Sequence, residues 1–277
     1  MKQYTRLEIK QMIRHLREKN EPFLICASGL GLVGHYAEMG GADMAAIYSS
    51  AYWRLQGYET VISDCHVGNT NQMALDLAER QSTVIEHIPV MAGIFCSENY
   101  WDWDEYFGML KQRGFSAVMN FPTYSMATGE WRFGAETAGV GLPMEISTLE
   151  KAADNDLFAM GVAFDGDDAE QIAKSEKIDM ILLHMGLLRS DRAMGLEEMT
   201  DRMNGTIRRI RAVNPSIPVI FTGGSVRAPE ETAYIYEHTD AIGYFAGEAI
   251  DVGAVLQPMI DVGNALASCR TSSRKEA

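Results

Sequence analysis

Residues 179–187 read Asp179-Met180-Ile181-Leu182-Leu183-His184-Met185-Gly186-Leu187 and give the clearest strand signal in the chain. Four apolar residues stand between an aspartate and a histidine, a pattern typical of a parallel strand that is buried on both faces. In a barrel of parallel strands, the side chain at the C-terminal end of a strand faces the substrate mouth. His184 is therefore the first candidate for catalysis. The alternative is a core histidine whose ring nitrogens are satisfied by the backbone.

Seven further apolar segments repeat this pattern. The expected strands are Phe23–Ala27, Met44–Tyr48, Val90–Cys96, Ala117–Phe121, Phe158–Phe164, Met180–His184, Pro218–Thr222 and Ala241–Phe245. Segments with helical periodicity lie between them and after the last one, namely Asn71–Gln81, Trp103–Arg113, Glu145–Asn155, Asp167–Ser175, Leu196–Val213, Pro229–His238 and Asp251–Leu266. Repeated alternation of strand and helix over 277 residues predicts an α/β fold, a (β/α)8 TIM barrel of roughly 250 residues. An open doubly wound sheet is the structural alternative.

The barrel is expected to span residues 22–266. Residues 1–21 form an N-terminal helix that closes its bottom, and residues 267–277 form a flexible tail. Long loops are expected after strands 2, 4 and 6, at the face where such barrels carry their active sites. They are Ser49–Gly68, Pro122–Pro143 and Leu187–Gly195.

Composition narrows the class of protein. A formal net charge of −14 argues against binding nucleic acid, and no apolar run is long enough for a membrane span. The first twenty residues lack the apolar core of a signal peptide, and the four cysteines form no CxxC pair, so we expect a cytoplasmic protein with reduced thiols. A small anionic substrate stays compatible with this charge because several arginines fall in predicted loops, namely Arg54, Arg132, Arg189, Arg192 and Arg227.

Gly29-Leu30-Gly31-Leu32-Val33-Gly34 matches the GxGxxG pattern of dinucleotide-binding folds. Such a site also needs an acidic residue at the end of the second strand, and this chain has Tyr48-Ser49-Ser50 there. We therefore expect these glycines to let the backbone pass close to a ligand or a neighbouring strand.

Other polar residues follow the strands of the predicted barrel. Asn120 could hold a carbonyl or enolate oxygen, and Glu136 could act as a base or acid if burial raises its pKa. Each could instead fix a loop through a hydrogen bond. The N–H groups of Gly223, Gly224 and Ser225 could hold a carboxylate, whereas Glu248 argues against a phosphate at that place.

Two further chemistries stay open. A metal site could draw on several residues, but these have no recognised ligand spacing. They are Asp64, Cys65, His66, Glu98, Asp165 and His184. Cys96 could be a nucleophile beside a base, or a buried inert thiol.

Several motifs resemble the phosphoenolpyruvate hydrolase-like family of TIM barrels. They lie within residues 22–250 and comprise Gly40–Asp43, Tyr48–Ser50 with Arg54, Pro89–Gly93, Gly114–Thr123, Glu136–Gly141, His184–Leu187 and Gly223–Gly224. The resemblance implies a barrel related in fold to the phosphoenolpyruvate mutase and isocitrate lyase superfamily. The family also supplies a domain of certain plant antiviral resistance proteins.

The chain departs from these patterns at several places. Ser49 stands where the family usually has asparagine, and Gly247–Asp251 replaces a segment that bears serine and arginine. The magnesium-binding aspartates of the mutases correspond to Ala92–Phe95, and a strand 4 glutamate corresponds to Asn120. No cofactor is therefore firmly implied, although a divalent metal such as Mg²⁺ stays open.

Residues and resemblance together predict an enzyme that hydrolyses or cleaves a bond in a small oxo acid or dicarbonyl compound through an enolate. His184 would transfer a proton, Asn120 would hold the oxyanion and Glu136 would assist. The substrate-binding candidates are Ser28, Gly29, Tyr48, Ser49, Arg54, Thr123, Gly223, Gly224, Ser225 and Gly247. We expect a small anionic substrate and, from the assemblies of the related superfamily, a homo-oligomer. The alternative is a barrel that binds a ligand or protein without turnover.

Overall fold

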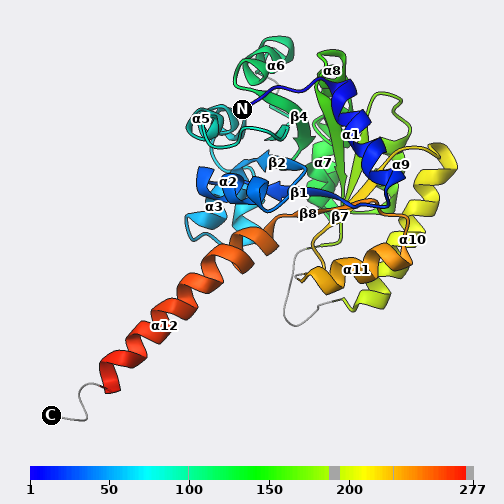
Figure 1. Ribbon diagram of the computed structural model, residues 1–277. Coiled ribbons are helices and arrows are strands. Elements are labelled where there is room, and N and C mark those ends of the chain that lie inside the picture. Colours follow the sequence, from blue (N-terminus) through cyan, green and yellow to red (C-terminus); the bar gives the residue numbers. More distant parts are fainter. Residues whose placement is uncertain (99, 187–193, 227, 273–277) are drawn as a thin grey trace.

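A computed structural model describes residues 1–98, 100–186, 194–226 and 228–272. Within them, consecutive parallel strands pair from β1 round to β8, and β8 pairs with β1 to close a barrel (Figure 1). The strands are β1 (Phe23–Ala27), β2 (Met44–Ile47), β3 (Val90–Ile94), β4 (Phe115–Asn120), β5 (Phe158–Ala163), β6 (Met180–His184), β7 (Val219–Thr222) and β8 (Gly243–Ala246). The predicted TIM barrel is confirmed, and the open sheet is excluded.

Helices surround the barrel and occupy its loops. They are α1 (Arg6–Glu18), α2 (Gly31–Met39), α3 (Ser49–Leu55), α4 (Thr60–Ser63), α5 (Thr70–Gln81), α6 (Trp103–Gln112), α7 (Gly129–Thr137), α8 (Leu142–Asp154), α9 (Gly166–Ala173), α10 (Leu196–Val213), α11 (Pro229–His238) and α12 (Gln257–Ser272). Two irregular turns of helix, η1 (Tyr124–Met126) and η2 (Ala249–Leu256), complete the set in the described residues.

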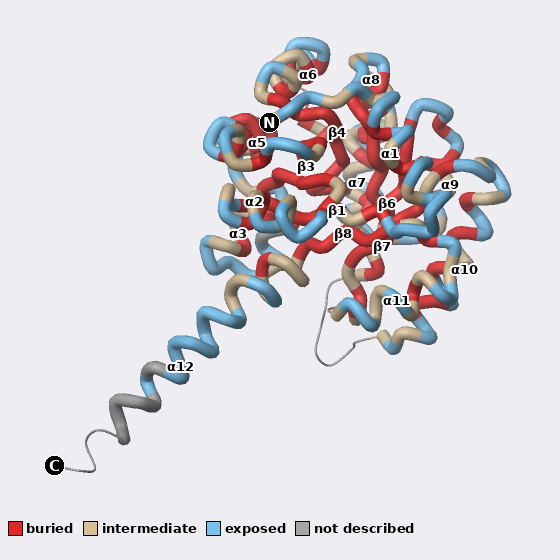
Figure 2. Tube along the Cα trace, viewed as in Figure 1, coloured by how far each residue is buried: buried red, intermediate tan, exposed pale blue. Residues whose placement is uncertain are grey.

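Strand β6 shows how the barrel sorts its side chains. Met180 and Leu182 belong to the interior cluster, whereas Ile181 and Leu183 belong to the cluster between sheet and helices. Because side chains alternate along a strand, His184 follows Met180 and Leu182 on the interior side. Figure 2 shows the strands as a nearly continuous buried layer. The strand's period thus carries His184 to the open end of the barrel.

Helix α1 covers the opposite end of the barrel. Its Ile9 and Ile13 are buried and belong to the same interior cluster as the inward-facing strand residues. Thr5 and Glu8 form a capping box that fixes the start of this helix. The N-terminal end of the barrel is therefore filled, and a ligand has to enter from the C-terminal ends of the strands.

Two of the three long loops contain helices of their own. The loop after β2 holds α3 and α4, and the loop after β4 holds η1 and α7. Most of the loop expected at Leu187–Gly195 lies outside the described residues. The GxGxxG glycines serve close packing, because a Cβ on Gly29 would lie 2.3 Å from the Ala51 carbonyl oxygen and one on Gly34 would lie 2.5 Å from Ser28 Oγ.

Helix α12 extends away from the barrel, continuing from η2 (Figure 1). It runs to Ser272, into the stretch expected to be a flexible tail. Its apolar residues Met259, Ile260 and Val262 are exposed (Figure 2). None of the helices in the described part of the chain combines the length and apolarity required to span a bilayer.

Candidate active site

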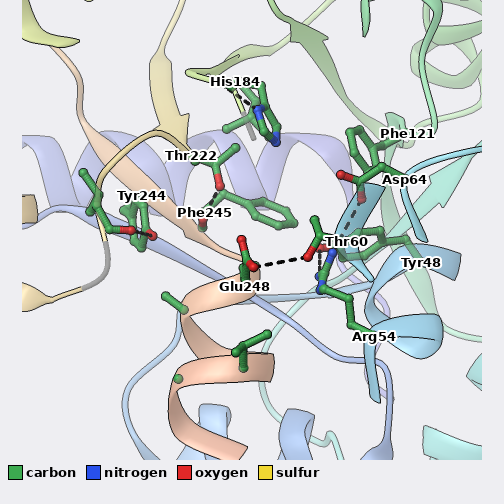
Figure 3. Close-up of a pocket in the computed structure, with 18 of the residues that line it drawn as sticks. Tyr48, Arg54, Thr60, Asp64, Phe121, His184, Thr222, Tyr244, Phe245 and Glu248 are labelled. Carbon is green, nitrogen blue, oxygen red and sulfur yellow. Dashed lines mark hydrogen bonds and ion pairs between the residues drawn. The ribbon is translucent and has the colours of Figure 1, made fainter. Parts of the chain in front are cut away.

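A cavity of about 200 Å³ opens at the C-terminal ends of the strands. Its walls come from β4, β6, β7, β8 and η2 and from the segment after β2 that contains α3 and α4. They include His184, Thr222, Phe121, Phe245 and Tyr48 (Figure 3). The position agrees with the general location of active sites in TIM barrels. Five of the predicted site residues line it, namely Tyr48, Arg54, His184, Gly223 and Gly247.

His184 presents one defined nitrogen to this cavity. Its ring stacks on Phe164 with a centroid separation of 4.2 Å, and its Nδ1 accepts a hydrogen bond of 3.2 Å from the Gly186 N–H. Burial lowers the pKa of His184 to about 3, and the positive charges of Arg54 and Arg202 act in the same direction. The imidazole is therefore neutral, with its proton on Nε2. Figure 3 shows this second nitrogen turned toward the cavity.

Two glycines make this geometry possible. Gly186 has φ +101°, a conformation that favours glycine, and its N–H reaches back to His184. Gly223 has φ +71°, and a Cβ there would lie 2.6 Å from the Gly186 carbonyl oxygen and 2.9 Å from His184 Cε1. The glycines after β6 and β7 therefore position the histidine, and Gly223, which was expected to bind substrate, also lines the cavity.

Arg54 forms the charged side of the cavity. Its Nε and Nη2 donate to Asp251 Oδ2 at 2.9 and 2.6 Å, and Nη2 also donates to the Tyr48 hydroxyl at 2.8 Å. Its Nη1 lies 3.6 Å from Asp64 Oδ1. Helix α3 places Arg54 six residues after Tyr48, so the guanidinium returns over the phenol ring. All three guanidinium nitrogens therefore face partners within the protein.

The two aspartates of this cluster are unusual. Burial raises the pKa of Asp64 to about 6 and that of Asp251 to about 6, although Arg54 opposes the shift in both. Asp64 is 2% exposed, and its Oδ1 has no hydrogen-bond partner in the part of the chain that the structure describes. Arg54 Nη1, at 3.6 Å, balances its charge but is too far away for a hydrogen bond, so a donor from a ligand or solvent would still stabilise this oxygen.

Glu248 is the residue before η2 and lies two residues after the end of β8. Its Oε1 accepts a hydrogen bond of 3.2 Å from Thr60 Oγ1, and Figure 3 shows the other carboxylate oxygen turned toward the cavity. Thr222 Oγ1 donates to the Phe245 carbonyl oxygen at 2.7 Å, which uses its proton within the wall. Glu248 is therefore well placed to exchange a proton with a molecule in the cavity.

Asn120 lies behind the cavity wall. Its side-chain nitrogen donates to Glu145 Oε2 at 2.7 Å, and its side-chain oxygen accepts from the Val162 N–H at 2.7 Å. Thr123 also donates to Glu145 Oε2, at 2.6 Å. Burial raises the pKa of Glu145 to about 7, against the lowering effect of these hydrogen bonds. Asn120 and Thr123 thus hold β4, β5 and α8 together, and their positions do not support the substrate roles expected of them.

Glu136 lies on α7, away from the cavity. It is exposed and accepts a hydrogen bond of 2.8 Å from Arg132 Nε. Arg132 also contacts Asp165 and the buried Asp168. Arg132, Glu136 and Asp165 border an open groove between α7, α9 and α10. The geometry fits the alternative expected for Glu136, a hydrogen bond that fixes a loop.

The remaining expected ligand-binding residues do not line the cavity, and the buried Ser49 Oγ has no hydrogen-bond partner in the described chain. Ser28 donates to Gln81 Oε1 at 2.5 Å, and Ser225 donates to the Met194 carbonyl oxygen. A Cβ on Gly224 would meet Met199, and Ser49 is buried at the start of α3. Arg189, Arg192 and Arg227 lie outside the described residues.

Glu248, Asp64 and Asp251 complete the site, although sequence reasoning did not give them catalytic or binding roles. Glu248 comes two residues after the end of β8, and extending the rule that favoured His184 to the residues just after a strand would have selected it. Asp64 was expected only as a metal-capable residue. Cys96 is buried, and burial raises the pKa of its thiol, as expected of an inert cysteine.

A model of proteins described as phosphoenolpyruvate hydrolase-like matches residues 8–260. The chain belongs to this family. Among curated relatives, the ToMV susceptible protein tm-1(GCR26) of Solanum lycopersicum is 28% identical over 247 residues, and the ToMV resistance protein Tm-1(GCR237) of the same plant is 27% identical over 247 residues. Each match covers 87% of this chain but 33% of the relative, so the chain spans about a third of the length of these proteins.

Solved structures share the fold at low sequence identity. A 2,3-dimethylmalate lyase of the PEP mutase/isocitrate lyase superfamily matches with a TM-score of 0.58 and 14% identity, covering 98% of this chain and 87% of that one. Phosphonopyruvate hydrolase with oxalate and Mg²⁺ gives 0.57 and 16%, covering 95% and 88%. Oxaloacetate acetylhydrolase with its product oxalate gives 0.60 and 11%, covering 94% and 86%. The predicted kinship in fold to this superfamily is confirmed.

The magnesium of the hydrolase complex does not fit the residues of this chain. Mg²⁺ prefers carboxylate and other oxygen ligands, and the end of β3 offers Ala92, Gly93 and Ile94. Of the cavity carboxylates, Asp64 has Arg54 as its counterion and Glu248 has one oxygen bound to Thr60. Within the described residues, no three His, Cys, Asp or Glu side chains are grouped so that they could hold a metal ion.

Proposed function

We propose that this barrel is an enzyme that cleaves a bond next to the carbonyl group of a small oxo acid or dicarbonyl compound, through an enolate. The observation that carries the proposal is the neutral His184, whose Nε2–H faces the same cavity as the Glu248 carboxylate (Figure 3). A neutral donor and a carboxylate around one cavity suit the transfer of a proton from carbon or water with build-up of charge on oxygen. The family and the enzymes that share the fold support this reading.

Hydrolysis of a dicarbonyl compound illustrates the roles. Glu248 takes a proton from water, and the resulting hydroxide adds to one carbonyl carbon. The carbon–carbon bond then breaks, giving a carboxylic acid and an enolate whose oxygen accepts a hydrogen bond from His184 Nε2. Glu248 returns the proton to the enolate carbon, so one water is consumed and the enzyme is restored. In this scheme His184 donates a hydrogen bond and Glu248 moves the proton.

Tyr48 adds a second neutral donor. Its hydroxyl oxygen accepts from Arg54, and this leaves the phenol proton free to be donated. Burial raises the pKa of Tyr48 well above its usual range, so the phenol stays protonated. Figure 3 places Tyr48 and His184 around the same cavity. Two neutral donors stabilise an enolate oxygen without a metal ion or a free cation in the described wall.

The test compares two glutamates of the chain, one in the cavity and one outside it. Glu248→Gln keeps the size and the Thr60 contact but removes the base, so kcat should fall by ~10²–10⁴-fold while ligand affinity is kept. Glu136→Gln removes a carboxylate from the exposed α7 groove and serves as the matched control. Its kcat should stay within about twofold of wild type.

Turnover would be followed on a panel of oxo acids and dicarbonyl compounds. Equal losses in the two variants would exclude Glu248 as the base. A panel without turnover, with one compound that raises the melting temperature, would favour a binding protein instead.

The expected homo-oligomer stays a prediction. Helix α12 leaves the barrel with Met259, Ile260 and Val262 exposed, and a second copy of the chain is the partner we propose for it (Figure 2). Light scattering at micromolar concentration should give at least twice the monomer mass. Monomers alone would rule the assembly out.

A further inference from the structure

The charges around the cavity select against an anionic ligand. Among the described residues that line it, Arg54 is positive and Asp64 and Glu248 are negative, and Asp251 behind Arg54 adds another negative charge. The guanidinium is already shared between Asp251, Tyr48 and Asp64. A carboxylate entering here would meet carboxylates without gaining a free cation, and removing it from water would add to the cost.

The hydrogen-bonding groups around the cavity indicate what the ligand offers. Asp64 lines the cavity, and its Oδ1 accepts no hydrogen bond in the described chain, although Arg54 Nη1 lies 3.6 Å away. A carboxylate oxygen of Glu248 faces the cavity (Figure 3). Both are acceptors, so they call for donors such as hydroxyl groups. His184 Nε2 and the Tyr48 hydroxyl are donors, so they call for an oxo oxygen. A ligand that carries both a carbonyl and hydroxyl groups satisfies all four.

The rest of the lining is aromatic and aliphatic. Tyr48 lies edge-on to Phe121 and to Phe245, with ring centroids 5.8 Å apart in each pair. Met119 and Leu182 add apolar surface to the cavity wall beside these rings. A dry cavity of ~150 Å³ holds a benzene molecule. The volume of about 200 Å³ therefore suits a single ring with short substituents.

We propose that the substrate is an uncharged, hydroxylated aryl ketone, an acylated phenol, and not a small dicarboxylate. This inference rests on the function proposed above, because an ortho-hydroxyaryl ketone is the enol form of a dicarbonyl compound. The acyl oxygen accepts from His184, and the ring hydroxyls donate to Asp64 and Glu248. The ring lies against Phe121 and Phe245. The carboxylates that repel an oxo acid become the groups that recognise this substrate.

Three ring compounds of matched size test the class. Dihydroxyacetophenone with ortho and para hydroxyls has all the required groups, the corresponding dihydroxybenzoate replaces the acetyl group by a carboxylate, and acetophenone lacks the hydroxyls. Calorimetry at pH 7 with the full chain should show the dihydroxy ketone binding at least ~10-fold more tightly than either of the others. Oxalate is the fourth probe and should bind more weakly than the dihydroxy ketone. Tighter binding of the benzoate or of oxalate, or no binding by any probe, would overturn the proposal.

Variants that remove a negative charge test which residues cause the preference for the dihydroxy ketone over the benzoate. Asp64→Asn should reduce the preference for the ketone over the benzoate several-fold, because a repelling charge is lost. Glu248→Gln should act in the same direction and replaces Asp64→Asn if that variant does not fold. Glu136→Gln, in the outer groove, should leave the preference unchanged. An unchanged preference in the cavity variants would refute the assignment of Asp64 and Glu248.

Turnover separates this inference from the proposed function. Cleavage of oxaloacetate together with tight oxalate binding would overturn the aryl ketone and keep the enzyme. Tight binding of the dihydroxy ketone without cleavage of any oxo compound would keep the ligand class and overturn the enzyme.

Discussion

Two arginines of this chain each hold several carboxylates, one inside the barrel mouth and one on its outer surface. Arg54 is 4% exposed and contacts Asp251 and Asp64, which are 0% and 2% exposed. Arg132 is 23% exposed, and of its partners Asp168 is buried while Glu136 is 47% exposed. The chemistry of the two clusters is alike, but their surroundings differ.

The difference shows which cluster shapes the reaction site. Water screens the outer charges, so Arg132 mainly fixes α7, a helix without buried residues of its own, to Asp168 at the start of α9. Inside the mouth, the same kind of ion pair lies in a medium of low polarity, where each charge alters the pKa of its neighbours. An ion pair that is buried next to a cavity therefore has a larger effect on the pKa values of the site residues than an exposed pair has on its own neighbours.

Removing each arginine in turn should give the largest contrast. Arg54→Met leaves Asp64 and Asp251 buried without their cation and should lower the free energy of unfolding by ~3–5 kcal/mol. Arg132→Met keeps the same stem length and is the matched control. Asp168 retains its hydrogen bond from Ser125, so the loss there should be only ~1–2 kcal/mol. Urea unfolding at pH 7.5 measures both, and equal losses would break the comparison.

The second contrast concerns the pH dependence of catalysis. With the pKa of His184 at about 3, this histidine stays neutral throughout the working range. His184→Gln should lower kcat by ~10²–10³-fold, because an oxyanion donor is misplaced. The limbs of the pH–rate profile between pH 5 and 8 should remain where they are in the wild type. A limb that disappears in the mutant would instead make His184 the titrating acid or base.

The sequence predicted the barrel well because each strand carries its own apolar run between turn residues. It could not place Asn120 because this residue ends β4, a strand that is buried on both faces, between the equally buried Met119 and Phe121. Met119 and Phe121 face the interior, and Asn120 faces α8. Because both faces are buried, no alternation of apolar and polar residues reveals which way Asn120 points. Glu136 and Glu248 both follow strands, but only the three-dimensional course of α7 carries Glu136 away from the mouth.

Glu145 is a buried carboxyl group that extends the comparison. Its hydrogen-bond donors are uncharged, whereas Asp64 lies beside the positive charge of Arg54. Burial raises the pKa of Glu145 to about 7, so between pH 4.5 and 7 the folded chain keeps a proton that the unfolded chain releases. Stability should therefore fall as pH rises through this window, by at most ~1.4 kcal/mol per pH unit from this group. Glu145→Gln removes the proton exchange but keeps an acceptor for Asn120 and Thr123. Melting temperatures from pH 6 to 7 should decline less in the variant, because Asp64 and Asp251, whose pKa values are about 6, titrate in both proteins alike. Parallel curves would disprove the link to Glu145.

Salt should act on the two arginine clusters differently, and this is the smallest effect that we expect. Raising NaCl from about 0.1 to 1 M shortens the screening length from ~10 to ~3 Å, which weakens exposed ion pairs and leaves buried pairs nearly unchanged. Arg132 loses part of its attraction to Asp165 and Glu136, whose side chains are 46% and 47% exposed, so the cost of Arg132→Met should shrink by roughly 0.5 kcal/mol. The cost of Arg54→Met should stay constant, because Arg54, Asp64 and Asp251 are shielded from ions in solution. Urea titrations of the wild type and both variants at the two salt concentrations give these differences. A cost of Arg54→Met that shrinks as much as that of Arg132→Met would mean that ions reach the cavity cluster, and the low-polarity surroundings invoked for Asp64 and Asp251 would no longer hold.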